Sequence, residues 1–140
     1  MPTTISHVTF DCHDTYAQAR FWCAVFEVGM DPEDLVGDPE SIVRLPSGPV
    51  LLFELVPEGK TVKNRVHLDL SPPTTRDEEV LRLEGLGATI VGDERRPDGT
   101  GWVVMTDPEG NEFCVERSSA ERERGARADT VTATGIRSGP

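Results

Sequence analysis

A chain of 140 residues is the size of one domain and is long enough to bury a hydrophobic core. Its 25 acidic and 14 basic residues give a formal net charge of −11, which repels nucleic-acid phosphates and anionic membrane surfaces. No apolar run reaches the roughly eighteen residues of a membrane span, and no signal-peptide layout opens the chain, so a cytoplasmic protein is expected. Three cysteines without a CxxC pair predict reduced thiols.

The beginning of the chain predicts a strand followed by a helix. Apolar and polar residues alternate over residues 5–12, which indicates a strand with one face on a core and His7 on the opposite face. Asp14 and Thr15 then form a capping pair. Aromatic and aliphatic residues follow at helical spacing and predict a helix that ends near Gly29.

A loop and a hairpin are predicted next. Residues 30–40 are acidic and contain two prolines, which indicates mostly loop with room for one short irregular strand. Residues 41–45 and 50–56 flank a Pro-Ser-Gly-Pro turn, which is typical of a hairpin. Glu54 lies on the second arm, on the face opposite Phe53.

The second half of the chain repeats this order after a polar connector, EGKTVKN. Residues 66–71 alternate again and place His67 on the polar face of a strand. Thr74 and Thr75 cap a helix that Gly87 ends, and residues 88–92 predict a strand.

The last predicted hairpin consists of residues 102–106 and 112–116, which flank an Asp-Pro-Glu-Gly turn. Glu116 lies on its final arm, opposite a row of apolar side chains. Residues 118–140 hold almost no large apolar side chain, so we expect a domain over 1–117 and a polar tail that is weakly structured in isolation.

The same His-to-Glu pattern thus occurs twice. The separation is 47 residues from His7 to Glu54 and 49 residues from His67 to Glu116. The predicted fold is α+β, with two βαβββ modules that form a cup-shaped mixed sheet with the helices outside. Two imidazoles and two carboxylates that meet in such a cup would bind a divalent metal, and this donor set suits Zn, Ni, Co, Mn or Fe without selecting one.

Four further residues border the predicted cup. Asp11 and Asp69 share the polar faces with the histidines, where they orient the rings, hold a ligand or are solvated. Arg44 and Trp102 fall on bordering strands and could contact an anionic or an apolar group, although packing at the core or rim is the favoured role for Trp102.

Three spans, ISHVTFDC, LLFELVPEGKTVKNRVHLDL and TDPEGNEFCVER, resemble the vicinal oxygen chelate superfamily of glyoxalase I, extradiol dioxygenases and the fosfomycin- and bleomycin-resistance proteins. The resemblance covers residues 5–117 and is closest to small, single-domain glyoxalase-like members. It implies metal ligands at His7, Glu54, His67 and Glu116, with Glu116, or else Glu54, as the catalytic base. It also implies a homodimer, whose cups form within one chain or across subunits.

The resemblance implies a metal-dependent lyase or isomerase that stabilises the enediolate of a small oxygenated substrate. His7, His67 and Glu116 alone would form the triad of an extradiol-type dioxygenase, an alternative that Glu54 makes less attractive. The non-enzyme alternative is a metal-free small-molecule-binding protein of bleomycin-resistance type, in which the acidic charge would suit a cationic ligand. Neither a nucleic acid nor a membrane is an expected partner.

Overall fold

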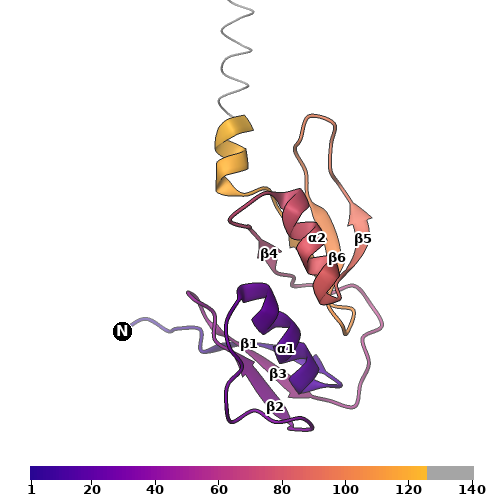
Figure 1. Ribbon diagram of the computed structural model, residues 1–140. Coiled ribbons are helices and arrows are strands. Elements are labelled where there is room, and N and C mark those ends of the chain that lie inside the picture. Colours follow the sequence, from indigo (N-terminus) through magenta and orange to yellow (C-terminus); the bar gives the residue numbers. More distant parts are fainter. Residues whose placement is uncertain (126–140) are drawn as a thin grey trace, which may run out of the picture.

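The computed structural model describes residues 1–125, which form two sheets with helices on their apolar faces (Figure 1). In chain order the elements are β1 (His7–Cys12), α1 (Thr15–Phe26), β2 (Glu40–Val43), β3 (Val50–Leu55), β4 (Asp69–Leu70), α2 (Arg76–Leu86), β5 (Thr89–Asp93), β6 (Val103–Thr106) and β7 (Glu112–Val115). The predicted tail begins with a further helical segment, 119–125, and its remaining residues, 126–140, lie outside the described residues.

Apart from one edge strand, the two halves of the chain share one topology, and the predicted α+β class is confirmed. In the N-terminal unit the strand order is β1-β3-β2, with β1 parallel to β3 and β2 antiparallel to it. In the C-terminal unit the order is β4-β7-β6-β5, and again only the first strand runs parallel to its neighbour. The strands therefore form two open sheets rather than one continuous cup.

The N-terminal unit is one strand shorter than the predicted βαβββ pattern. Between α1 and β2 the chain forms turns, because acidic side chains accept the hydrogen bonds that a neighbouring strand would otherwise supply. Asp31, Asp34 and Asp38 accept from the main-chain N–H groups of Glu33, Ile42 and Leu35, each at 2.9 Å. The unit is consequently βαββ.

Both long helices begin and end at residues with the expected chemistry. The side chain of Asp14 caps α1, and that of Thr75 caps α2, each by accepting a main-chain N–H of the first turn. Gly87 ends α2 in the left-handed region, at φ 112°, as predicted. α1 ends before Gly29, because Glu27 adopts the left-handed conformation at φ 55°. Neither these helices nor the rest of the described chain offers a helical stretch long and apolar enough to cross a bilayer.

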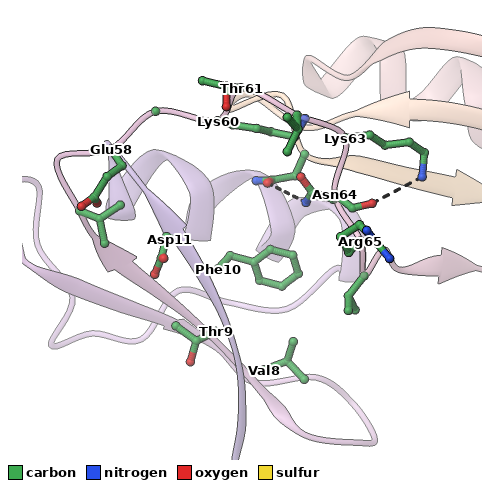
Figure 2. A pocket seen from close by; sticks show the side chains of 15 residues that line it. Val8, Thr9, Phe10, Asp11, Glu58, Lys60, Thr61, Lys63, Asn64 and Arg65 are labelled. Carbon is green, nitrogen blue, oxygen red and sulfur yellow. Dashed lines mark hydrogen bonds between the residues drawn. The ribbon is translucent and has the colours of Figure 1, made fainter.

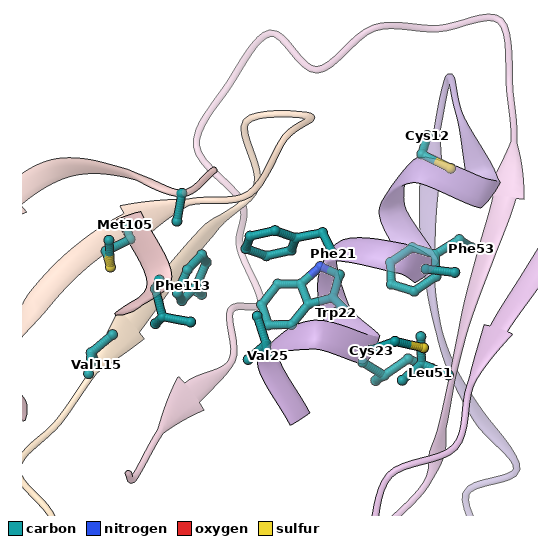
Figure 3. Packing of buried hydrophobic residues seen from close by; sticks show 14 of the residues in the cluster. Cys12, Phe21, Trp22, Cys23, Val25, Leu51, Phe53, Met105, Phe113 and Val115 are labelled. Carbon is teal, nitrogen blue, oxygen red and sulfur yellow. The ribbon is translucent and has the colours of Figure 1, made fainter. Parts of the chain in front are cut away.

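Helix α1 packs against both sheets and joins the two units (Figure 3). The Trp22 ring meets the Phe113 ring of β7 edge to face, with centroids 5.1 Å apart, and Phe21 lies 6.4 Å from the same ring. Trp22 Nε1 and Gln18 Nε2 both donate to Asp107 Oδ2, at 3.2 and 2.8 Å. The core is therefore continuous across the two units.

The turn between β6 and β7 makes a second link between the units. The Glu109 carboxylate accepts hydrogen bonds of 2.8 Å from the main-chain N–H groups of His13 and Asp14, just before α1. Asp107 also accepts the N–H groups of Glu109 and Asn111 and so shapes the turn itself. The Asp-Pro-Glu-Gly-Asn segment thus fixes the position of the C-terminal sheet relative to α1.

Candidate functional site

The strand register separates His7 from Glu54. Both side chains lie on the exposed face of the N-terminal sheet, as predicted, but Glu54 pairs with Asp11 of β1. His7 pairs with Val50, four residues earlier on the same strands, which corresponds to about 13 Å at roughly 3.3 Å per residue. Glu40 of β2 flanks Glu54 on its other side, so the neighbours of Glu54 are carboxylates rather than an imidazole.

In the C-terminal unit, too, the glutamate lies further along the paired strands than the histidine. Asp69 pairs with Cys114 of β7, and the main-chain N–H of Glu116 donates to Leu70 O at 2.8 Å, so Glu116 lies further along the sheet than His67. Its carboxylate accepts a hydrogen bond of 2.5 Å from Arg122 Nη2. The duplication inferred from the sequence is therefore real, but in both units the register carries the glutamate away from its histidine.

The structure instead brings together His67, Asp69 and Cys114. His67 Nδ1 and Asp69 Oδ1 are 2.9 Å apart, and the potential ligand atoms of all three residues lie within 4.8 Å of one another. Among residues 1–125 this is the one group of three or more His, Cys, Asp and Glu side chains with that geometry. His7, Glu54 and Glu116 are not part of it.

Cys114 was not predicted as a site residue, because the two units were compared only by the spacing between their histidine and glutamate residues. Matching them by parallel register gives a different correspondence, in which the pair Asp69 and Cys114 is equivalent to the pair Thr9 and Leu52. Leucine has no donor atom, so the N-terminal unit lacks the equivalent group. The sequence signal that could have identified Cys114 was the alternation of apolar and polar side chains along β7, which puts Cys114 on the same face as Glu116.

A cavity of about 360 Å³ lies over this group, on the polar face of the C-terminal sheet. Trp102 and Val104 form its apolar wall. Its remaining lining residues are polar or charged: Lys63, His67, Asp69, Glu112, Cys114 and Glu116. We call this space the main cavity. Small-molecule sites commonly combine an apolar wall with a few converging polar groups in this way.

The Cys114 thiol is held in its protonated form. Burial raises its pKa to about 11, and the nearby Asp69 carboxylate adds to the effect by repelling negative charge and accepting a hydrogen bond from the thiol. A reactive cysteine requires a lowered pKa, so the site does not resemble that of a cysteine nucleophile. A metal ion that bound here would displace the thiol proton.

Glu112 attaches the polar connector to β7 at the edge of the main cavity. Its carboxylate oxygens accept hydrogen bonds of 2.9 Å from Lys60 Nζ and from the main-chain N–H of Asn64. Burial raises the pKa of Glu112, but these hydrogen bonds outweigh it and bring the pKa to about 2. The contacts place Lys63 in the lining of the cavity.

The connector also covers a larger cavity, of about 590 Å³, beside β1. Figure 2 shows Val8 and Phe10 of β1 across this space from Lys63, Asn64 and Arg65. Asn64 Nδ2 donates to Asn111 Oδ1 at 2.9 Å. The connector is therefore a wall shared by two cavities, a role that its polar composition alone did not indicate. The His67, Asp69 and Cys114 group does not line the larger cavity, which makes the main cavity the candidate site.

Duplicated units of this topology, with polar sheet faces bordering cavities and helices behind, define the vicinal oxygen chelate class. Within that class, the chain belongs to the family of the glyoxalase-like domain, which matches residues 7–116. The resemblance drawn from the three sequence spans is confirmed. No curated protein sequence matches the chain.

Solved structures support the same fold. A glyoxalase/bleomycin resistance protein/dioxygenase family enzyme from Burkholderia phytofirmans PsJN aligns at a TM-score of 0.62 and 18% identity, over 81% of this chain and 97% of that one. A point mutant of the fosfomycin resistance protein FosX from Listeria monocytogenes, complexed with Mn(II) and 1S,2S-dihydroxypropylphosphonic acid, aligns at 0.63 and 18% identity, over 86% and 94%. A hypothetical protein from S. aureus aligns at 0.63 and 17%, over 83% and 94%. At these identities the likeness concerns the fold alone.

Proposed function

We propose that this protein binds a small oxygenated molecule in the main cavity and holds a divalent metal there through His67, Asp69 and Cys114. The observation that carries the proposal is that the three potential ligand atoms lie within 4.8 Å of one another on the cavity wall. One nitrogen, one oxygen and one sulfur donor fit a divalent transition metal, and the thiolate favours Zn over Mg or Ca. The Mn(II) in the FosX complex shows that a relative with this fold takes such an ion.

The reaction we propose is that of a lyase or isomerase acting through an enediolate. A metal bound at this position would polarise a substrate oxygen and stabilise the developing negative charge. His67 Nδ1 and Asp69 Oδ1 lie 2.9 Å apart, so these two donors are already close together before a metal arrives. Trp102 and Val104 exclude water from one side of the cavity. Glu116 lines the same cavity and is our candidate for the base that moves the proton.

The four-ligand set His7, Glu54, His67 and Glu116 remains a prediction. Within one chain the register separates each glutamate from its histidine. One arrangement that would bring the set together is a homodimer, with the polar sheet face of the N-terminal unit of one copy against that of the C-terminal unit of the other. A homodimer of this kind would bring Glu54 to the site as a second candidate base. The dioxygenase alternative needs His7 beside His67 and Glu116, and so depends on the same assembly.

A metal-free binding protein is the second candidate. The observation that favours it is the apolar wall of Trp102 and Val104 beside polar groups, which can recognise a small molecule without a metal. In that case the main cavity would recognise its ligand by the Trp102 wall and by hydrogen bonds from the His67 and Asp69 pair.

Elemental analysis of protein purified without added metal or chelator distinguishes these proposals. We expect near-stoichiometric metal in the wild type, with loss in Cys114→Ser and His67→Ala and no change in Glu54→Gln. Loss in Glu54→Gln and His7→Ala, together with a dimeric mass in solution, would instead establish the four-ligand set. Absence of metal, with no rise in melting temperature on adding Zn, would leave the metal-free binding protein.

A further inference from the structure

A second, smaller cavity of about 250 Å³ adjoins the main cavity at its rim. Three arginines, Arg96, Arg117 and Arg122, line it, together with Thr100, Gly101, Trp102 and Glu116. We call it the basic pocket. The chain as a whole carries a net charge of −11, yet one carboxylate faces three guanidinium groups among these lining residues. Trp102 and Glu116 line both cavities, so the two spaces are neighbours.

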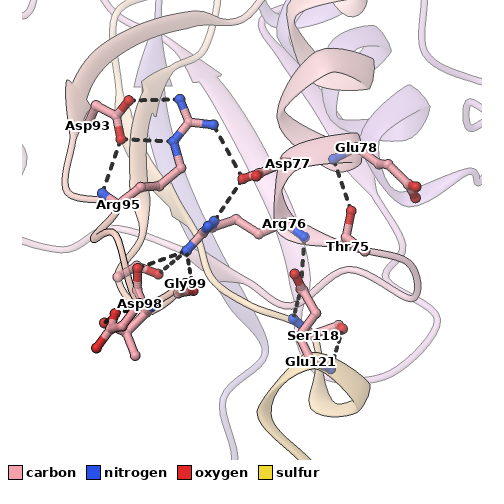
Figure 4. Close-up of polar contacts among 12 residues, drawn as sticks. Thr75, Arg76, Asp77, Glu78, Asp93, Arg95, Asp98, Gly99, Ser118 and Glu121 are labelled. Carbon is pink, nitrogen blue, oxygen red and sulfur yellow. Dashed lines mark hydrogen bonds and ion pairs between the residues drawn. The ribbon is translucent and has the colours of Figure 1, made fainter. Parts of the chain in front are cut away.

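Buried Arg76 holds one wall of the basic pocket in place (Figure 4). Its guanidinium Nη1 donates at 3.0 to 3.1 Å to three successive carbonyl oxygens, those of Gly99, Thr100 and Gly101. Gly101 has φ 95°, and an added Cβ would lie 1.9 Å from Glu94 O, so the loop passes directly against the end of β5. The loop that carries Arg96 is therefore fixed before any ligand binds.

The same arginine also fixes the opposite wall. Glu121 Oε2 accepts from the main-chain N–H of Arg76 at 2.8 Å and from that of Ser118 at 2.7 Å, which attaches the helical segment 119–125 to the start of α2 (Figure 4). Arg122 projects from this segment toward Glu116. Both walls are thus held by contacts to one residue, and such preorganisation lowers the entropic cost of binding.

Trp102 joins the basic pocket to the main cavity. Its side chain is 39% exposed, unlike the buried Trp22, and the guanidinium carbon of Arg96 lies 5.5 Å from the centre of its ring. A planar or apolar ligand body resting on Trp102 in the main cavity would place an attached acidic group among the arginines. Guanidinium groups match carboxylate and phosphoryl oxygens in charge and in geometry.

We propose that the basic pocket binds the carboxylate or phosphoryl group of the ligand whose body occupies the main cavity. The proposal rests on the proposed function only in taking the main cavity as the binding site, and it requires no metal. Glu116 already accepts a hydrogen bond from Arg122, so its carboxylate competes with the anion of the ligand for this guanidinium group and repels the anion. The three arginines make this rim locally basic on a chain whose net charge is −11.

The test follows the two indole N–H signals of the ¹⁵N-labelled full chain by NMR, with Trp102→Phe identifying the signal of Trp102. The probes are benzoate, phenyl phosphate and uncharged benzyl alcohol. We expect at least one anion to shift the Trp102 signal, the Trp22 signal to stay in place, and binding to weaken as salt is added. If only benzoate or only phenyl phosphate shifts the Trp102 signal, the result shows which acidic group the pocket prefers.

Matched variants assign this binding to the pocket. Arg96→Gln and Arg117→Gln should each weaken the anion about five- to tenfold, within the range for charge-assisted hydrogen bonds that are partly exposed. Arg20→Gln makes the same charge change on an exposed face of α1 and should have no effect. Glu116→Gln should strengthen binding because it removes the competing carboxylate.

Three outcomes would overturn the proposal. They are no shift of the Trp102 signal with either anion, an affinity for benzyl alcohol equal to that for benzoate, and a loss of anion affinity in Arg20→Gln equal to that in the pocket variants. Each is independent of metal content, so a failure here and a failure of the metal site remain distinguishable.

Discussion

The N-terminal and C-terminal units have the same strand connectivity but present different chemistry on equivalent polar faces. Where the C-terminal unit has Asp69 beside Cys114, the N-terminal unit has Thr9 beside Leu52. The histidine two residues before each pair and the glutamate two residues after it are common to both units. Duplication has thus preserved the backbone, the histidine and the glutamate, while the pair between them diverged from a carboxylate and a thiol to a hydroxyl and an alkyl group.

The largest expected effect tests whether the two units are independent. Trp22→Ala should destabilise the protein by about 4 kcal/mol, because it removes the ring that α1 packs against Phe113 and takes one donor from Asp107. Chemical denaturation should still show one transition for both units. Trp102→Ala, at a half-exposed position, is the control and should cost less than about 1 kcal/mol. Two separate transitions in the wild type would contradict the continuous core.

The difference between the units can be tested by transplanting the donor group. Thr9→Asp with Leu52→Cys would place a carboxylate and a thiol beside His7 in the register that Asp69 and Cys114 have beside His67. We expect the double variant to bind a second equivalent of Zn, as measured by equilibrium dialysis.

Two controls accompany the transplant. Leu52→Ser with Thr9→Asp lacks the thiolate and should bind Zn more weakly at that position by about tenfold or more. A transplanted unit that binds no extra Zn, while the wild type binds one, would show that register alone does not specify the site.

The smallest effect concerns the attachment of the connector to the C-terminal unit. The folded-state pKa of Glu112 is about 2, below its ordinary value of 4.5, so its contribution is present above pH 4.5 and is lost as pH falls toward 2. Lys60→Met should therefore destabilise by about 1 kcal/mol at pH 7 and by much less near pH 2.5. Urea denaturation at the two pH values measures the difference. An equal loss at both would show that the contact is packing rather than charge.

Much of the fold could be predicted because its signals are local. The alternation that put His7 on the polar face of a strand, the caps at Asp14 and Thr75, and the stop at Gly87 depend on neighbouring residues alone. The segment before β2 was ambiguous for the same reason. Its aspartates satisfy backbone groups from within the loop, and the sequence does not distinguish this from a short strand. The strand predicted over 66–71 is shorter in the structure, because only Asp69 and Leu70 pair with β7, and His67 precedes it.

By itself, the sequence determined the class of the protein: the repeated order of strands and helices, the polar faces and the glyoxalase-like spans. Tertiary structure decided which polar side chains meet, because parallel pairing joins residues that are far apart in the chain. The observed register places Cys114 opposite Asp69, and a register shifted by two positions would place Glu116 there instead. It also decided that Arg76 would hold two separate segments around a basic pocket. Local periodicity encodes the face of a strand, whereas its register depends on packing between distant segments.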